Sequence, residues 1–383
     1  MNTQSETDRK RCREWGLDWW RLSPGQFNAI TDVEGVAVGH STIIEGEGPL
    51  VPGEGPIRTG VTAVLPHRGN LFQEKVIAAV HTINGFGKVT GFEQIRELGI
   101  LESPIALAET LNVGLVADAL VAHALRENRE IGIGCSMNPV VGECFHGVLS
   151  DVRGRHIREH HVMHAIDNAQ GGAVEEGNIG GGTGNSCFGW KGGIGTSSRR
   201  LSEVVGGFTV GTLVQTNFGS PPDLIIGDDH AGRHLLPPRR TSTTQNCPPE
   251  SSEDPNQEED KGSIMIVLAT DAPLSPLQLR RICTRAGAGL ARTGTHHGHG
   301  SGDFVIGFST AQRIPHHAEG LALPCQFLRD DSKLLGGLFL ATVEAVEEAI
   351  LNSMFMAETM TGRDSVTRHA FPVKQWLASI LHR

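Results

Sequence analysis

Tyrosine is absent from the 383 residues of this chain, so no phenol can take a catalytic role. The chain also lacks any apolar run near the roughly 18–20 residues that a membrane-spanning helix needs, and its polar start lacks the apolar stretch of a secretory signal. We therefore expect no membrane association. Hydrophobic residues at 38% and charged residues at 20% are typical of a soluble globular protein with enough chain for one large layered domain or two.

Cysteine pairs and basic stripes are missing as well. The cysteines are scattered and include no C-x-x-C pair, which predicts reduced thiols in a cytoplasmic protein and argues against a disulfide framework or a zinc knuckle. No basic stripe with interleaved aromatic residues is present, so we expect no nucleic-acid partner.

Glycine is abundant, with 49 residues, but its clusters match no nucleotide-binding motif. Residues 184–191 depart from the G-x-x-x-x-G-K-[ST] spacing of a phosphate loop, and no G-x-G-x-x-G follows a strand and opens a helix. We therefore expect no nucleotide cofactor. Such a glycine content permits tight turns and the close approach of one backbone segment to another or to a ligand.

Two histidine clusters raise the question of a metal. Residues 156–160 read H-x-x-E-H, as in inverted zinc peptidases, and a helix there would place His156, His160 and His164 on one face. No carboxylate ligand is identifiable elsewhere, so an ordinary amphipathic helix is the favoured interpretation and zinc catalysis the open alternative. The second cluster, residues 296–299, lies in a glycine-rich loop without a partner cysteine, which favours a polar pocket lining.

Much of the negative charge lies directly before an apolar strand. The formal net charge is −10, and residues 248–261 hold six carboxylates against one lysine, a net −5. The surrounding segment, about 237–261, predicts an exposed linker. After it, residues 264–269 form a continuous apolar run, typical of a strand covered on both faces.

The junction between them, Gly262-Ser263, is the candidate for nucleophilic chemistry. If this peptide bond broke, Ser263 would carry both a hydroxyl nucleophile and a free α-amine, a base whose unperturbed pKa is about 7.7–8.0. From local sequence alone, a surface loop that happens to end in Gly-Ser is the alternative.

Strands and helices alternate along the chain, which predicts a layered α/β sandwich. The apolar runs predict strands at residues 61–65, 76–83, 208–215, 263–269 and 304–308. The helical signals lie at residues 104–126, 275–290 and 338–360. In the second of these, Ser275 can cap the helix and Pro276 suits its first turn.

Three further polar side chains lie next to a glycine or close to one. Ser301 stands between two glycines directly before a strand, where Asp303 could orient its hydroxyl or a neighbouring amine. Asn217 ends a strand, and an amide so placed can donate to a developing oxyanion, a contribution of about 2.7–4 kcal/mol where measured. All three are also common turn formers, and spacing alone does not bring them together.

Twelve motifs, in order over residues 28–383, resemble the L-aminopeptidase D-amidase/D-esterase family, which includes the β-peptidyl aminopeptidases. They are RTGVTA at 58–63, NGFGK at 84–88, TLNVG at 110–114, NPVVGE at 138–143, GTG at 182–184, CFGWKGGIGT at 187–196, QTNFG at 215–219, GS at 262–263, ATDAPL at 269–274, GLARTG at 289–294, SGD at 301–303 and AETMTGR at 357–363.

The resemblance implies a four-layer α/β/β/α sandwich, N-terminal-nucleophile-like and related to the ornithine acetyltransferase fold. It implies maturation by self-cleavage between Gly262 and Ser263. After a polar extension at residues 1–27, the α chain would span 28–262 and the β chain 263–383, together forming one composite domain. Homo-oligomers of such cleaved units are also expected from the family.

The family also implies a role for each candidate. Ser263 would be the nucleophile, Ser301 would hydrogen-bond the reacting centre, and Asp303 occupies a position where the family places an acidic residue. Asn217 would stabilise the oxyanion, and Glu143 would receive the free amino group of the substrate through a charge-assisted hydrogen bond. No metal or other cofactor is implied. The substrates would be short peptides, amides or esters with a free amine, hydrolysed through an acyl-enzyme.

The chain departs from the family pattern after Glu143. Where the family commonly has a polar Asn or Tyr followed by Asp-Gly, this chain has Cys144-Phe145-His146-Gly147, so Phe145 becomes a candidate substrate contact. The linker before Ser263 is also longer and more acidic than usual. Two other functions stay open at this point: an uncleaved, non-catalytic binding protein, and an acyltransferase of the ornithine acetyltransferase type. That acyltransferase uses threonine as its nucleophile, so Ser263 argues against it.

Overall fold

A computed structural model describes residues 9–238 and 262–381. Apart from its first two residues, the predicted acidic linker at 237–261 lies outside this part of the chain. Within it, no helix is both long and apolar enough to cross a membrane.

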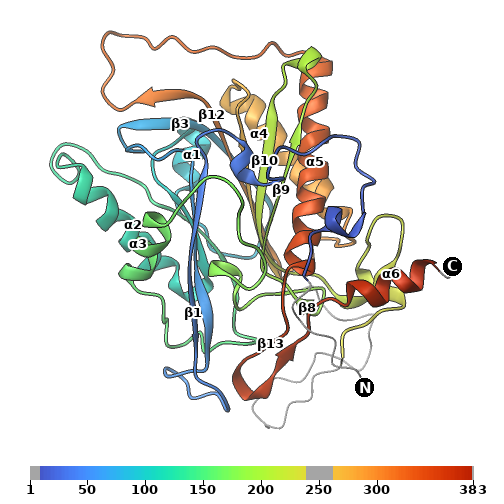
Figure 1. Cartoon of the computed structure of the whole chain (residues 1–383). Helices are drawn as coiled ribbons and strands as arrows, with labels where there is room; N and C mark the ends of the chain where they lie inside the picture. The colour runs from blue at the N-terminus through green and yellow to red at the C-terminus, as the bar shows by residue number, and fades with distance from the viewer. Residues whose placement is uncertain (1–8, 239–261, 382–383) are drawn as a thin grey trace.

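Two β-sheets lie face to face in the centre of the molecule (Figure 1). The smaller sheet has the order β1 (Ala37–Glu45), β2 (Ile57–Leu65), β5 (Ile105–Glu109), β6 (Val140–Cys144). The larger sheet has the order β4 (Ile100–Leu101), β3 (Glu74–Gly85), β12 (Gly302–Pro315), β11 (Ser263–Thr270), β10 (Thr209–Asn217), β9 (Ile194–Arg200).

Helices cover the outer face of each sheet (Figure 1). Helices α2 (Val113–Glu127) and α3 (Glu159–Asp167) lie on the smaller sheet, and α4 (Pro276–Ala291) and α5 (Ser332–Phe355) lie on the larger. Smaller elements complete the chain: α1 (Phe92–Leu98), α6 (Val373–Leu381), and the short pairs β7–β8 (Ser186–Cys187, Trp190–Lys191) and β13–β14 (Met360–Thr361, Thr367–Arg368).

The buried apolar residues follow these layers. One cluster joins the two sheets, with Leu107 of β5 and Val267 of β11 among its members. A second lies between the smaller sheet and α2 and α3, and a third between the larger sheet and α4 and α5. The prediction of a four-layer α/β/β/α sandwich is confirmed.

Strand β11 is the apolar run that the sequence predicted, and every one of its residues is buried. It pairs antiparallel with β10 and parallel with β12, so neither edge is free. Because both faces contact apolar clusters, alternation of polar and apolar residues is not needed, which explains the uninterrupted run.

The helix prediction at 275–290 was right to within one residue, whereas the one at 338–360 was displaced at both ends. Helix α4 begins at Pro276, and the hydroxyl of Ser275 accepts a hydrogen bond from the Gln278 N–H at 3.3 Å. Helix α5 begins at Ser332 rather than 338, because the Asp331 carboxylate caps its first turn, and it ends at Phe355 rather than 360.

The predicted helix at 104–126 was wrong in its first part. Residues 105–109 form the buried strand β5, and α2 begins only at Val113. The sequence of this strand is compatible with a helix, but pairing with β2 on one side and β6 on the other decides its conformation.

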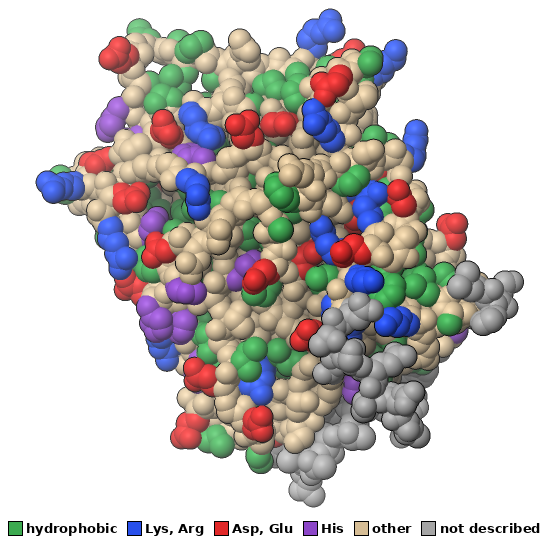
Figure 2. All heavy atoms as spheres, in the orientation of Figure 1, with side chains coloured by type: hydrophobic (Ala, Val, Ile, Leu, Met, Phe, Trp, Pro, Cys, Tyr) green, Lys and Arg blue, Asp and Glu red, His purple; other side chains and the backbone are tan. Residues whose placement is uncertain are grey.

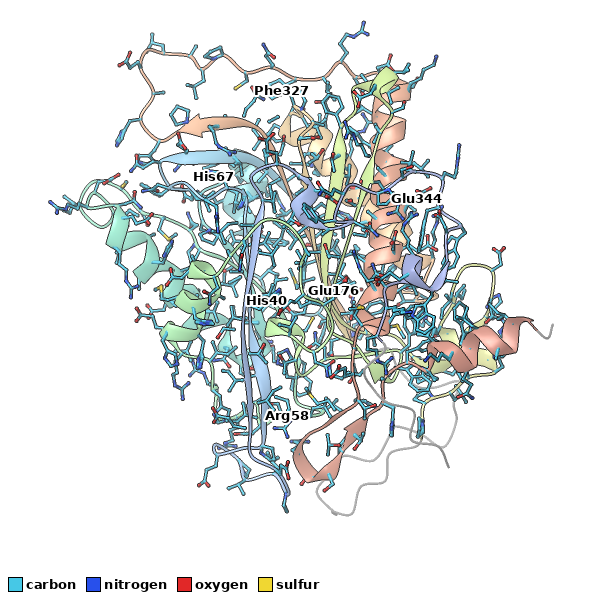
Figure 3. All side chains as sticks on the ribbon, in the orientation of Figure 1. His40, Arg58, His67, Glu176, Phe327 and Glu344 are labelled. Carbon is cyan, nitrogen blue, oxygen red and sulfur yellow. The ribbon has the colours of Figure 1, made fainter. Side chains whose placement is uncertain are left out.

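The first described residues pack onto the sandwich through buried carboxylates, two of which, Glu176 and Glu344, are labelled in Figure 3. Arg11 Nε lies 2.7 Å from Glu176 Oε2. Glu344 of α5 accepts from the N–H groups of Arg21 and Leu22 at 2.9 and 3.1 Å. The N-terminal segment is thereby fixed to α5 and to the segment before β9.

Charges of both signs are interspersed on the face drawn in Figure 2, where lysines and arginines lie among aspartates and glutamates. This distribution differs from the basic stripe typical of a nucleic-acid-binding surface.

Gly195 of β9 lets α5 approach the sheet closely, because a Cβ there would lie 2.0 Å from the Ala349 carbonyl oxygen. We expect Gly195→Ala to lower the free energy of unfolding by about 1–3 kcal/mol through overpacking. Gly336→Ala in the same helix is the matched control, since a Cβ there meets nothing within 4 Å. It should stabilise the protein by about 0.5–1 kcal/mol. Urea unfolding of both variants checks this, and equal midpoints would contradict it.

Candidate active site

The register of the larger sheet brings the predicted residues together. Ser263, the first residue of β11, lies opposite Asn217, the last residue of β10. On its other side Ser263 lies opposite Gly302, the first residue of β12, which is flanked by Ser301 and Asp303. The structure therefore gathers at one end of the sheet residues that are far apart in the sequence.

Gly262 is held tightly at this end of the sheet. Its carbonyl oxygen accepts a hydrogen bond from the Gly302 N–H at 3.0 Å. A Cβ on Gly262 would lie 2.3 Å from Phe218 Cα and 2.4 Å from the Asn217 carbonyl oxygen, so only glycine fits without a shift of backbone. The Gly262–Ser263 peptide is fixed between two neighbouring strands, and Ser263 itself is 7% exposed.

The side chain of Asn217 is oriented by a single backbone donor. Its Oδ1 accepts a hydrogen bond from the Ser186 N–H at 2.9 Å. Because the amide oxygen is engaged in this way, the Nδ2 group is directed away from β7. Among the described residues no hydrogen bond engages Nδ2, so its N–H groups can serve a further acceptor.

Lys191, which the sequence analysis did not single out, supports the segment around Ser186 that orients Asn217. It lies opposite Ser186 in the β7–β8 pair. Its Nζ donates to the carbonyl oxygens of Asn185 at 2.8 Å and Gly192 at 2.6 Å, and its side chain is buried. Burial lowers the pKa of Lys191 to about 7. The sequence did offer a signal for this residue. Lys191 stands inside an apolar, glycine-rich motif, where a solvent-exposed lysine is not expected.

Ser301 and Asp303 form a buried pair. Ser301 Oγ donates to Asp303 Oδ1 at 2.6 Å, and both residues are almost fully buried. The Ser301 carbonyl oxygen accepts from Asn84 Nδ2 and from the Phe86 N–H, which fixes the turn before β12. The hydroxyl is thus held by a carboxylate beside the start of β11.

Glu143 of β6 extends toward the same end of the larger sheet. Its Oε1 accepts from the Lys88 N–H at 3.0 Å, and the residue is buried. A Cβ on Gly87 would lie 3.3 Å from both Glu143 Oε1 and Gly302 Cα, which places the carboxylate beside the β12 turn. Burial raises the pKa of Glu143, and the Lys88 N–H and ammonium offset part of that rise.

A second buried carboxylate, Glu109, was also missed. It is the last residue of β5, where it lies opposite Cys144. Its Oε2 accepts from the Leu111 N–H at 2.9 Å, and its buried Oε1 has no hydrogen-bond partner among the described residues. Burial raises the pKa of Glu109 to about 8, and the Glu143 carboxylate acts in the same direction. Its signal in the sequence was a glutamate between an apolar run and the TLNVG motif.

The residues that depart from the family pattern differ in their exposure. The Phe145 ring is 46% exposed directly after β6. His146 is fully buried, with Nδ1 2.9 Å from Thr59 Oγ1, and burial lowers its pKa to about 3. His146 is therefore a neutral packing residue, whereas Phe145 is available for contact. Cys144 Sγ donates to the Ser263 carbonyl at 3.4 Å and links the two sheets.

The H-x-x-E-H motif does not form the predicted helical face. Helix α3 begins at Glu159, so His156 lies outside it, and His156 Nε2 is 2.8 Å from Asp151 Oδ2. In the described part of the chain, no group of three or more His, Cys, Asp or Glu side chains could hold a metal ion.

Comparisons with known proteins identify the family and the fold. The model of peptidase family S58 matches residues 28–368. Beta-peptidyl aminopeptidase BapA of Sphingosinicella xenopeptidilytica is 41% identical over 371 residues, which cover 97% of this chain and 90% of that protein.

Two solved structures share both fold and sequence. The PH0078 protein from Pyrococcus horikoshii OT3 is 44% identical with a TM-score of 0.87, covering 97% of this chain and 99% of the other. The L-aminopeptidase D-Ala-esterase/amidase from Ochrobactrum anthropi is 37% identical with a TM-score of 0.85, covering 97% of this chain and 98% of the other. That structure is described as a variant of the Ntn hydrolase fold. The family resemblance seen in the sequence is confirmed.

The pKa of Glu109 predicts a pH-dependent effect on stability. Since burial raises this pKa from 4.5 to about 8, the folded chain keeps a proton that the unfolded chain loses above 4.5. The stability that this group contributes is therefore lost as pH rises through that window. We expect Glu109→Gln, which cannot ionise, to gain stability relative to the parent between about pH 5 and pH 8. Urea unfolding across this range measures the difference.

The control is Glu97→Gln, which changes an exposed carboxylate of α1. A difference between Glu109→Gln and the parent that stays constant with pH would contradict the prediction.

Proposed function

The chain belongs to peptidase family S58 and is a hydrolase of the aminopeptidase type, and on that premise we propose a self-cleaving enzyme with Ser263 as its nucleophile. Its substrates would be short peptides, amino-acid amides or esters with a free amino group. The observation that carries the proposal is the position of Ser263, between Asn217 and Gly302 and directly after a tightly held glycine.

Self-cleavage would begin with attack of Ser263 Oγ on the carbonyl carbon of Gly262. The Gly302 N–H, which already donates to that carbonyl oxygen, would stabilise the negative charge that develops there. The peptide C–N bond then breaks, the hydroxyl proton passes to the leaving amine, and an ester joins the two chains. Water hydrolyses the ester and leaves a carboxylate on Gly262 and a free α-amine on Ser263.

The same hydroxyl would then attack the substrate carbonyl, with the new α-amine as the base that takes its proton. Asn217 Nδ2 would donate to the oxyanion, and Ser301, held by Asp303, would hydrogen-bond the reacting centre. The leaving amine takes up the proton, and the acyl group remains on Ser263. Attack by water releases the acid and restores the hydroxyl.

Recognition of the substrate amine is proposed for Glu143. A substrate ammonium would favour the ionised form of this buried carboxylate and would form a charge-assisted hydrogen bond with it. The exposed Phe145 ring is proposed to contact the substrate side chain. Assembly into homo-oligomers of cleaved units and a cytoplasmic location stay predictions from the sequence.

We expect Ser263→Ala to remain a single chain and to have no amidase or esterase activity, because it lacks the hydroxyl that both steps need. The parent should give two bands on a denaturing gel, near the sizes of residues 1–262 and 263–383. Gly262→Ala should be cleaved more slowly, since its Cβ displaces the scissile carbonyl. The control is Ser202→Ala, at an exposed serine, which should mature normally. Two bands from Ser263→Ala would overturn the assignment.

We expect Glu143→Gln to raise the KM for amino-acid p-nitroanilides by about tenfold or more, the effect of losing a charged hydrogen bond. The Gln side chain keeps an oxygen that can accept from the Lys88 N–H, so folding should be preserved. Steady-state kinetics with free and N-acetylated substrates measure the preference for an unblocked amine. An unchanged preference in the variant would rule out this role for Glu143.

A further inference from the structure

The histidine-rich loop before β12 takes no part in the chemistry described so far. Within it His297 has a φ of 58°, a left-handed conformation that is uncommon for residues other than glycine. Its N–H donates to Thr295 Oγ1 at 3.1 Å, which helps to hold this conformation. The side chain is only 24% exposed. An unfavourable backbone conformation at a candidate site indicates that the residue has a role for which this conformation is needed.

The ring of His297 is directed at Asp303. His297 Nδ1 lies 3.7 Å from Asp303 Oδ2, and this nitrogen is buried without a hydrogen-bond partner among the described residues. The other oxygen of Asp303 accepts from Ser301 Oγ. A buried carboxylate is stabilised by each additional N–H donor, and an imidazole carrying a proton on Nδ1 is such a donor in its neutral and its charged form.

The neighbouring histidines face other groups. His296 Nδ1 lies 3.8 Å from Asp223 Oδ2 and its side chain is 70% exposed. The His299 ring lies beside that of Phe86, with 6.4 Å between the ring centroids. His297 is thus the member of this loop whose ring is directed at the carboxylate next to Ser263.

We propose that His297 is a positioning residue that donates Nδ1–H to Asp303 and closes a Ser301–Asp303–His297 chain. With both carboxylate oxygens engaged, Asp303 cannot rotate, and the Ser301 hydroxyl keeps one direction toward the reacting centre. The 3.7 Å separation shortens to a hydrogen bond when substrate occupies the site, as catalytic contacts commonly do. This inference rests on the proposed function of Ser263 and Ser301.

Three substitutions separate this role from a purely structural one. The amide of Asn occupies nearly the position of Nδ1 and Asn tolerates the left-handed conformation, whereas the amide of Gln extends to the position of Nε2. On fully cleaved protein we expect His297→Ala and His297→Gln to lower kcat about tenfold with KM little changed, as for a lost hydrogen bond to a charged group. His297→Asn should stay within about threefold of the parent. His296→Ala is the matched control and should match the parent.

Equal kcat in His297→Ala, His297→Gln and the parent would overturn the proposal. So would an equal loss in all three variants, since Asn then fails to replace the Nδ1 donor. Thermal unfolding identifies any loss of kcat that comes from misfolding. In that case the kcat values of His297→Asn and His297→Gln, compared at matched stability, decide whether the Nδ1 donor is needed. Activity in Ser263→Ala would instead refute the proposed function, so the two failures are distinguishable.

Discussion

The site depends on the pairing of β11 with a strand on each side. Apolar side chains on both faces of β11 fix its register, because a shift by one residue would exchange the residues facing the two cores. That register sets Ser263 against Asn217 and Gly302. The proposed nucleophile is therefore held with the precision of a packed core although it follows the chain's most acidic segment in the sequence.

Buried ionisable groups surround this end of the sheets and set its chemical character. Glu109 and Glu143 come from the smaller sheet, and Lys191 supports the segment that orients Asn217. Removing such groups from water favours their neutral forms, which is why the carboxyl pKa values rise and that of the lysine falls. A cationic substrate amine would offset the desolvation cost of an ionised carboxylate at this site. In the proposed mechanism the two sheets would contribute different functions, amine recognition from the smaller sheet and acyl transfer from the larger.

The sequence predicted the structure correctly where a local signal and the tertiary environment agree. The apolar run of β11 and the Ser275 cap were both predicted, and twelve motifs indicated the family and its layered fold. The strand at residues 105–109 was not predicted, since sheet pairing overrides the helical tendency of this segment. Glu109 and Lys191 were missed because their importance lies in burial and direction, which the spacing of residues along the chain does not contain. The loop at 296–299 was predicted as a polar pocket lining, but the spacing did not single out His297 within it. The metal-binding interpretation of the H-x-x-E-H motif was wrong for the same reason. His156 forms a hydrogen bond with Asp151 and lies before the start of α3.

The central claim is that Ser263 is freed as an N-terminal residue and then carries the acyl group. Its most direct test is mass spectrometry of the enzyme quenched in acid during turnover of a slowly hydrolysed amino-acid ester. The account predicts a chain of residues 263–383 whose N-terminal peptide, beginning with Ser263, carries the mass of the acyl group. An uncleaved active chain, or an acyl group on a peptide without Ser263, would contradict it.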